Sequence, residues 1–104
     1  MAIEIYSKSN IGLVEHFGYL HYKDLDVIRK AADELQLACL QFLPYGGDIL
    51  FNSEQASHIL KKEIPLLQTH VALTPEYLEA INAITRAALA VSQKTHTFLI
   101  FEGD

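Results

Sequence analysis

The chain has 104 residues, which suits one domain with a substantial core, so we expect a single domain over residues 1–104. Half of its residues are hydrophobic, yet no apolar run approaches the roughly 18 to 20 residues that span a bilayer, so we expect a cytoplasmic protein without a membrane partner. A formal charge of −5 disfavours nucleic acid and favours a basic partner, although mild acidity is also typical of ordinary solubility.

The first residues have the pattern of a half-buried strand. In residues 2–7, Ile3 and Ile5 alternate with Glu4 and Tyr6, the period of two expected when one face of a strand is buried. Ser9 and Asn10 then offer capping oxygens, and apolar residues recur at helical spacing up to a glycine. This pattern predicts a short helix over residues 9–17, although residues 11–14 are equally compatible with an extended strand.

Residues 16–22 combine tyrosine, phenylalanine, leucine and two histidines around Gly18. We interpret them as a tightly packed aromatic turn whose polar atoms reach water or backbone. The alternative is a binding surface, because tyrosine and histidine provide contact area at low entropic cost.

A helix over about 24 to 36 follows, with Asp24 as its cap and leucine, isoleucine and alanine at helical spacing. The apolar run 37–43 predicts a buried strand that ends at Pro44. Residues 44–48 form a turn with two glycines, and residues 49–51 resume as a short strand, so we expect a hairpin.

The second half of the chain has clear helix signals. Asn52 and Gln55 resemble a capping box, and the helix that they begin must end or kink at Pro65. Residues 66–73 are expected to be a connection. Thr74 and Pro75 then begin a long helix over about 75 to 93, whose alanines allow close approach to a sheet or another helix.

The chain ends in the apolar segment 97–101, which predicts a central strand covered on both faces. We therefore expect an α+β fold, a two-layer sandwich with a four-stranded, mostly antiparallel sheet and helices on one or both faces. The expected order β-α-β-β-α-α-β is a variant of the ferredoxin-like arrangement in which the first and last strands are central. Cover for the second face would come from a helix or a second copy.

Few residues form a pattern associated with catalysis or metal binding. Cys39, the single cysteine, excludes an internal disulfide and lies among apolar neighbours, which favours core packing over reactivity. The histidines do not have metal-ligand spacing, and Gly46-Gly47 lies between two strands and lacks the lysine of a phosphate-binding loop. We expect no cofactor, no metal, no catalytic residue and no nucleic-acid partner.

Three short segments carry a family resemblance, namely His16–Tyr19, Glu63–Pro65 and the closing Leu99–Asp104. They resemble segments of small bacterial immunity proteins, which are encoded beside polymorphic or contact-dependent growth-inhibition toxins. The resemblance implies a stoichiometric inhibitor without an active site, which covers the catalytic cleft of a cognate toxin. Many such toxins are basic nucleases, and an acidic binder suits them electrostatically.

We therefore expect an immunity protein that contacts its toxin through aromatic and acidic residues, namely Tyr19, Tyr22, Tyr45, Asp48, Glu102 and Asp104. The alternative is a small enzyme or ligand-binding domain with a site near His96, Glu102 and Asp104. A third possibility is a homodimer that buries spare apolar surface.

Overall fold

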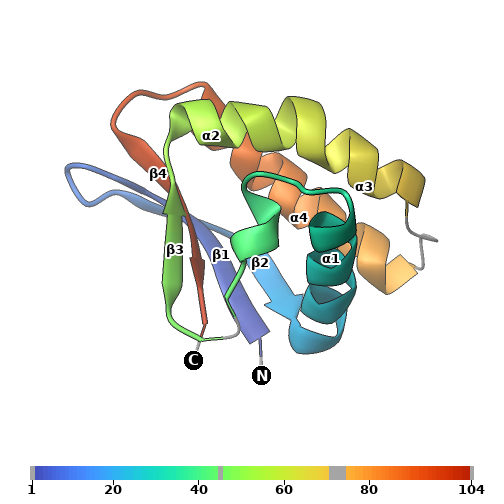
Figure 1. The fold of residues 1–104 in the computed structure, drawn as a ribbon. Coiled ribbons are helices and arrows are strands. Elements are labelled where there is room, and N and C mark those ends of the chain that lie inside the picture. Colours follow the sequence, from blue (N-terminus) through green and yellow to red (C-terminus); the bar gives the residue numbers. More distant parts are fainter. Residues whose placement is uncertain (1, 45, 71–74, 104) are drawn as a thin grey trace.

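The computed structural model describes residues 2–44, 46–70 and 75–103, and these build an antiparallel four-stranded sheet with helices packed on one face (Figure 1). The strands are β1 Ala2–Ser9, β2 Val14–His21, β3 Asp48–Phe51 and β4 Thr97–Glu102. The α-helices are α1 Tyr22–Glu34, α2 Ser53–His58, α3 Ile64–His70 and α4 Pro75–Ser92. A 3-10 helix, η1 Leu40–Phe42, and a π-helix, η2 Ile59–Glu63, complete the elements. The α+β class and the four-stranded antiparallel sheet are as expected from the sequence.

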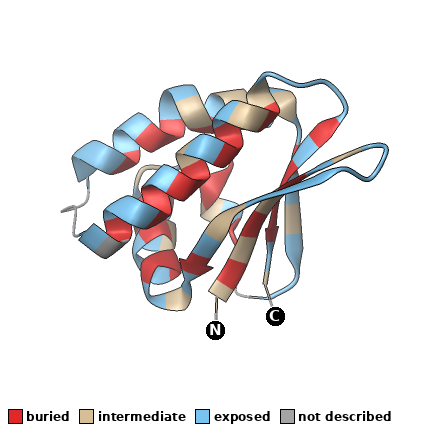
Figure 2. Ribbon diagram, turned by 180° about the vertical axis from the view of Figure 1, so that it is seen from behind, coloured by how far each residue is buried: buried red, intermediate tan, exposed pale blue. Residues whose placement is uncertain are grey.

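The strand order is β2-β1-β4-β3, so the first and last strands occupy the centre, as predicted. The order along the chain differs from the prediction, because the second strand follows the first directly in a hairpin and precedes α1. The core lies between the sheet and the helices, where apolar side chains from all four strands are buried (Figure 2). These strand residues are Ile3, Ile5, Leu20, Phe51, Leu99 and Phe101.

The predicted helix over residues 9–17 and the predicted aromatic turn over 16–22 are both wrong. Residues 14–21 form β2, paired with β1, and the register shifts between Ile5 and Tyr6 so that Phe17 is an extra, bulged residue. Gly18 follows with φ of 149°, which glycine adopts without strain, and a Cβ there would lie 3.3 Å from Ala83 of α4. Gly18 therefore permits the close contact between helix and strand for which the alanines of this helix were expected.

The predicted strand over residues 37–43 is also wrong, and with it the hairpin to residues 49–51. After α1 the chain passes through Gln36, whose φ of 54° reverses its direction, and winds through turns into η1. Leu37, Leu40 and Leu43 are buried as a strand would have buried them, but they line the core from a coiled segment. β3 pairs instead with β4.

The capping box at the start of α2 is confirmed: the Asn52 side chain accepts the Gln55 amide proton at 2.8 Å, and the Gln55 side chain accepts that of Asn52 at 2.9 Å. The helix does not end at Pro65. It widens into η2 over Ile59–Glu63 and continues as α3 through His70. A π turn shifts the hydrogen-bond ladder just before the proline, which has no amide proton to contribute. The expected start of the last long helix is confirmed at Pro75, whereas its cap Thr74 lies outside the described residues.

Helices cover only one face of β4. Phe98 on the other face keeps 38% of its surface exposed, whereas Ile100 beside it is 5% exposed. Of the two covers expected for the second face, a helix is therefore wrong for the described part of the chain, and a second copy stays a prediction. The second face of the sheet is open to solvent.

Candidate functional site

The open face of the sheet, on the side away from the helices, carries its side chains in rows that cross the strands. Because side chains alternate along a strand, Glu4 and Tyr6 point away from the core that receives Ile3 and Ile5. The strand registers then fix which residues of the neighbouring strands lie beside them. The first row contains, in spatial order, Tyr19, Glu4, Glu102 and Asp48.

We call Glu4, Glu102 and Asp48 the acidic row. Glu4 lies directly opposite Glu102, and Glu102 directly opposite Asp48, so three carboxylates occupy neighbouring positions on three strands. Like charges placed directly opposite each other destabilise a sheet by roughly 0.2 to 1 kcal/mol per pair. The acidic row therefore makes a destabilising contribution at one end of the open face.

The next two rows are more apolar. The middle row contains His16, Tyr6, Ile100 and Leu50. The last row contains Val14, Lys8 and Phe98. Leu50 is 52% exposed, so the middle row offers apolar contact area directly beside the carboxylates.

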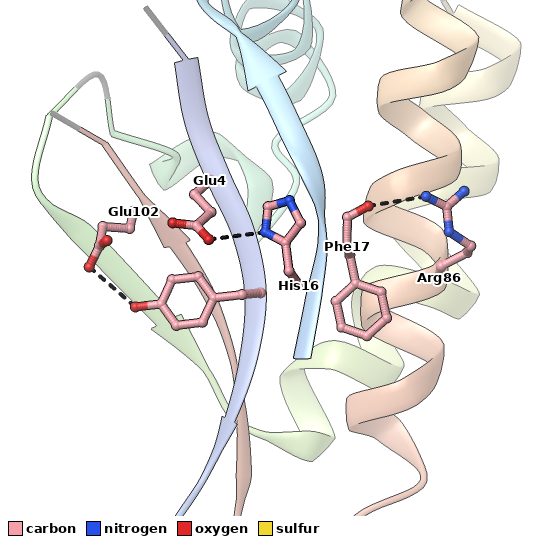
Figure 3. Close-up of polar contacts among 6 residues, drawn as sticks. Glu4, His16, Phe17, Arg86 and Glu102 are labelled. Carbon is pink, nitrogen blue, oxygen red and sulfur yellow. Dashed lines mark hydrogen bonds and ion pairs between the residues drawn. The ribbon is translucent and has the colours of Figure 1, made fainter. Parts of the chain in front are cut away.

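Polar contacts connect the rows (Figure 3). The Tyr6 hydroxyl donates a hydrogen bond to Glu102 Oε1 at 3.2 Å, and His16 Nδ1 lies 3.0 Å from Glu4 Oε2. The ring of His16 also packs against that of Tyr19, with centroids 4.9 Å apart and planes inclined by 57°. Two of the three acidic side chains are therefore held in place by neighbours on the same face.

The acidic row acts electrostatically on Tyr6. Partial burial raises the pKa of this phenol, and so do the hydrogen bond to Glu102 and the charges of Glu102, Asp48 and Glu4, in that order. A phenolate at this position would be repelled by all three carboxylates. The charge of the acidic row at one end of the open face therefore reaches Tyr6 in the middle row.

The structure brings together three of the predicted contact residues: Tyr19, Asp48 and Glu102 all lie in the first row, and Tyr19 is 58% exposed. Tyr22 does not join them, because it begins α1 and packs partly buried against the core. Tyr45 and Asp104 lie outside the described residues.

The predicted contact residues do not include Glu4, Tyr6 and His16, although the alternative interpretation of residues 16–22 as a binding surface covers His16. The alternation in residues 2–7 already placed Glu4 and Tyr6 on one side of a strand. It did not show which strands flank them, and the helix predicted over residues 9–17 removed His16 from the sheet. The pairing of β1 with β4 joins residues nearly a whole chain length apart, which no local pattern reveals.

The alternative site is not assembled. His96 precedes β4 and Glu102 ends it, so they lie about 20 Å apart along the strand. Asp104, its third predicted member, is outside the described residues.

A buried polar cluster lies on the helical side. Glu63 is 1% exposed, and its carboxylate accepts the amide protons of Leu40 at 2.9 Å and Cys39 at 3.1 Å, while His58 Nε2 lies 3.1 Å from Oε2. Glu63 thus caps η1, whose own N-cap residue provides no side-chain hydrogen bond. Burial raises the pKa of the Cys39 thiol to about 12, with further contributions from the charge and hydrogen bond of Glu63, so the thiol is not activated as a nucleophile.

A second exposed apolar patch, the hairpin tip, consists of Ile11, Leu13 and Val14 at the β1–β2 turn. This hairpin projects beyond the helices (Figure 1). Val14 belongs both to the hairpin tip and to the last row of the open face, so the two surfaces are continuous.

Within residues 2–44, 46–70 and 75–103, no group of three or more histidine, cysteine, aspartate or glutamate side chains is arranged to hold a metal ion. In the same ranges, no helix combines the length and apolarity needed to cross a membrane. A scan against protein-family models, a search of curated proteins and a search of solved structures each gave no significant match to this chain.

Proposed function

We propose that this chain is an immunity protein, which binds a cognate bacterial toxin domain in the cytoplasm and neutralises it by covering its active site. The observation that carries the proposal is the open face of the sheet, where the acidic row adjoins exposed aromatic and apolar side chains. The sequence resemblance to immunity proteins supports the same reading.

The charge of this face favours a basic partner. Three carboxylates on neighbouring strands raise the energy of the free protein, and a positively charged surface placed over them would remove that cost. A nuclease fits this description because its substrate cleft must attract a phosphate backbone. An inhibitor with a row of carboxylates can occupy such a cleft in place of the nucleic acid.

The apolar residues of the face supply the contact area. Tyr19 and Phe98 are exposed aromatic side chains at opposite ends of the face, and Leu50 lies at its margin. Aromatic residues dominate the binding energy of many interfaces, whereas charges at the rim act mainly on the rate of encounter. We therefore assign the binding affinity to Phe98 and the two tyrosines of this face, Tyr6 and Tyr19, and the fast association rate to the acidic row.

The proposal predicts that a toxin is encoded immediately upstream of this chain, and the test uses the toxin domain of that gene. Expressed alone, that domain should arrest growth, and co-expression of this chain should restore growth through a one-to-one complex. The association rate should fall about tenfold between low and high salt.

Two charge-matched triple variants then locate the contact surface. The test variant neutralises the acidic row through Glu4→Gln, Asp48→Asn and Glu102→Gln. The control neutralises three exposed acids on the helices through Asp26→Asn, Asp33→Asn and Glu79→Gln. Only the first should slow association by about tenfold. Equal effects of the two variants would reject the open face as the contact surface, and a toxin domain that forms no complex would reject the function.

A further inference from the structure

The open face ends at a free strand edge. β3 is the last strand in the sheet order, and among the described residues it pairs only with β4 (Figure 1). The Gly103 amide donates to the Gly47 carbonyl at 2.8 Å, which marks this as a hydrogen-bonded pair. Because such pairs alternate in an antiparallel ladder, Ile49 and Phe51 bond inward to β4, and the backbone groups of Asp48 and Leu50 point outward.

The two edges of the sheet differ. At the β2 edge, α4 packs closely on Gly18, and the Arg86 guanidinium donates to the bulged Phe17 carbonyl at 3.1 Å (Figure 3). At the β3 edge, Asp48 and Leu50 have exposed side chains as well as outward-pointing backbone groups. Short length and a charged residue limit uncontrolled pairing at such an edge but leave it available to a matching strand.

We propose that an extended segment of the basic partner adds to β3 as a fifth, antiparallel strand, a binding mode that rests on the proposed function. Asp48 and Leu50, whose backbone groups point outward, determine the residue pattern of the added segment. The side chain opposite Leu50 is apolar, and the side chain two residues later, opposite Asp48, is basic. The residue between them points to the other face, next to the partly buried Ile49.

Backbone hydrogen bonds and charge complementarity together favour this segment over an acidic or a purely apolar one. Its backbone satisfies the amide and carbonyl groups of Asp48 and Leu50, and its basic side chain lies opposite Asp48, where it extends the first row by one strand. The recognised chemistry is therefore a short β-strand of the type apolar-x-basic, in which x is any β-favouring residue.

The probe is an acetylated and amidated peptide, Thr-Val-Thr-Lys-Thr-Lys, added to the full chain and followed by amide chemical shifts and hydrogen exchange. We expect the largest shifts at Asp48 and Leu50, and slowed exchange of the Leu50 amide. A peptide N-methylated at the first lysine loses a backbone hydrogen bond but keeps its charge, and should bind about tenfold more weakly. Replacing both lysines by glutamate should also weaken binding about tenfold.

Two protein variants complete the test. Leu50→Pro removes the outward amide without breaking a bond to β4, so the fold should persist while peptide binding falls about tenfold. Leu50→Thr keeps the amide, so N-methylation of the peptide should still weaken its binding to this variant. If the N-methylated peptide and Leu50→Pro bind as well as their parents, strand addition is overturned. The proposed function is tested separately: it survives that result if the toxin domain still forms a complex with this chain, and fails if no complex forms.

Discussion

A single buried carboxylate stabilises the segment that sequence patterns assigned to a strand. Glu63 accepts the amide protons of Cys39 and Leu40 and lies within 3.1 Å of His58 Nε2. These contacts join η1 to the π-helix from a distance of more than twenty positions along the chain. The coiled path of residues 37–43 therefore depends on Glu63.

We predict that Glu63→Gln lowers the free energy of unfolding by about 1 to 3 kcal/mol. The amide that replaces one carboxylate oxygen is a donor, so one of the buried groups around it loses its acceptor. Urea denaturation with an unchanged dependence on denaturant would measure the effect. Glu79→Gln, at an exposed position on α4, serves as the control and should change stability by less than about 0.5 kcal/mol. Equal stability of the two variants would contradict this role of Glu63.

At the scale of elements, the acidic row lowers the stability of the sheet, while the same charges serve the binding of a basic partner. We predict that Glu102→Gln raises the free energy of unfolding by about 0.5 kcal/mol at low salt, because it removes two like-charge pairs at once. The side-chain oxygen that remains still accepts the Tyr6 hydroxyl. Thermal unfolding at low and high salt checks this, since the gain should shrink as salt screens the repulsion.

Glu15→Gln is the matched control for this prediction. Glu15 also lies on the sheet, but its carboxylate is 3.9 Å from Lys94 Nζ, so its removal relieves no repulsion. The control should show no gain in stability. A loss of stability in Glu102→Gln, or an equal gain in Glu15→Gln, would show that the acidic row is not strained by its own charge.

The elements that the sequence predicted well have strong local signals. α1 and α4 follow from the helical spacing of their apolar residues, the capping box follows from Asn52 and Gln55, and β4 was placed at the centre from its apolar composition. The predicted cap of α1 is wrong, because the helix begins at Tyr22 with His21 as its N-cap and Asp24 is buried in its first turn. The wrong predictions of secondary structure fall mainly in two segments that lack such signals. Residues 14–21 contain a bulge and a glycine that mimic a helix end, and the burial of residues 37–43 is equally consistent with a strand or a coil.

The candidate site was predicted only in part for a related reason. Asp48 and Glu102 were chosen as acids at the ends of strands, and the structure places them opposite each other. Glu4 belongs with them only because β1 pairs with β4 in one register, and a shift of one residue would turn its side chain toward the core. Register depends on the packing of the whole sheet and is not present in any one segment.

At the scale of the whole molecule, the core resists ionisation at high pH. Burial, and secondarily the charge of Asp24, raises the pKa of Tyr77 to about 12, a value similar to that of Cys39. In the unfolded chain these groups ionise near about pH 10 and 8.5. Their contribution to stability is therefore complete below those values and is lost as the pH rises through about 12.

We predict that the free energy of unfolding falls between about pH 9 and pH 12, and that the double variant Tyr77→Phe, Cys39→Ala shows a shallower fall over the same range. The wild-type chain provides the reference, and urea midpoints measured across this range are the observable. Identical slopes for the two proteins would mean that other groups control the alkaline transition.

The central strands have a further consequence for any polypeptide joined to this domain. β1 begins at Ala2 and β4 ends at Glu102. Because these central strands are antiparallel neighbours, the start of β1 and the end of β4 lie side by side at one end of the sheet (Figure 1). Glu4 and Glu102 lie near that end. A purification tag or fusion partner attached at either end would therefore lie close to the carboxylates of the acidic row. A basic tag would compete with the basic partner for them.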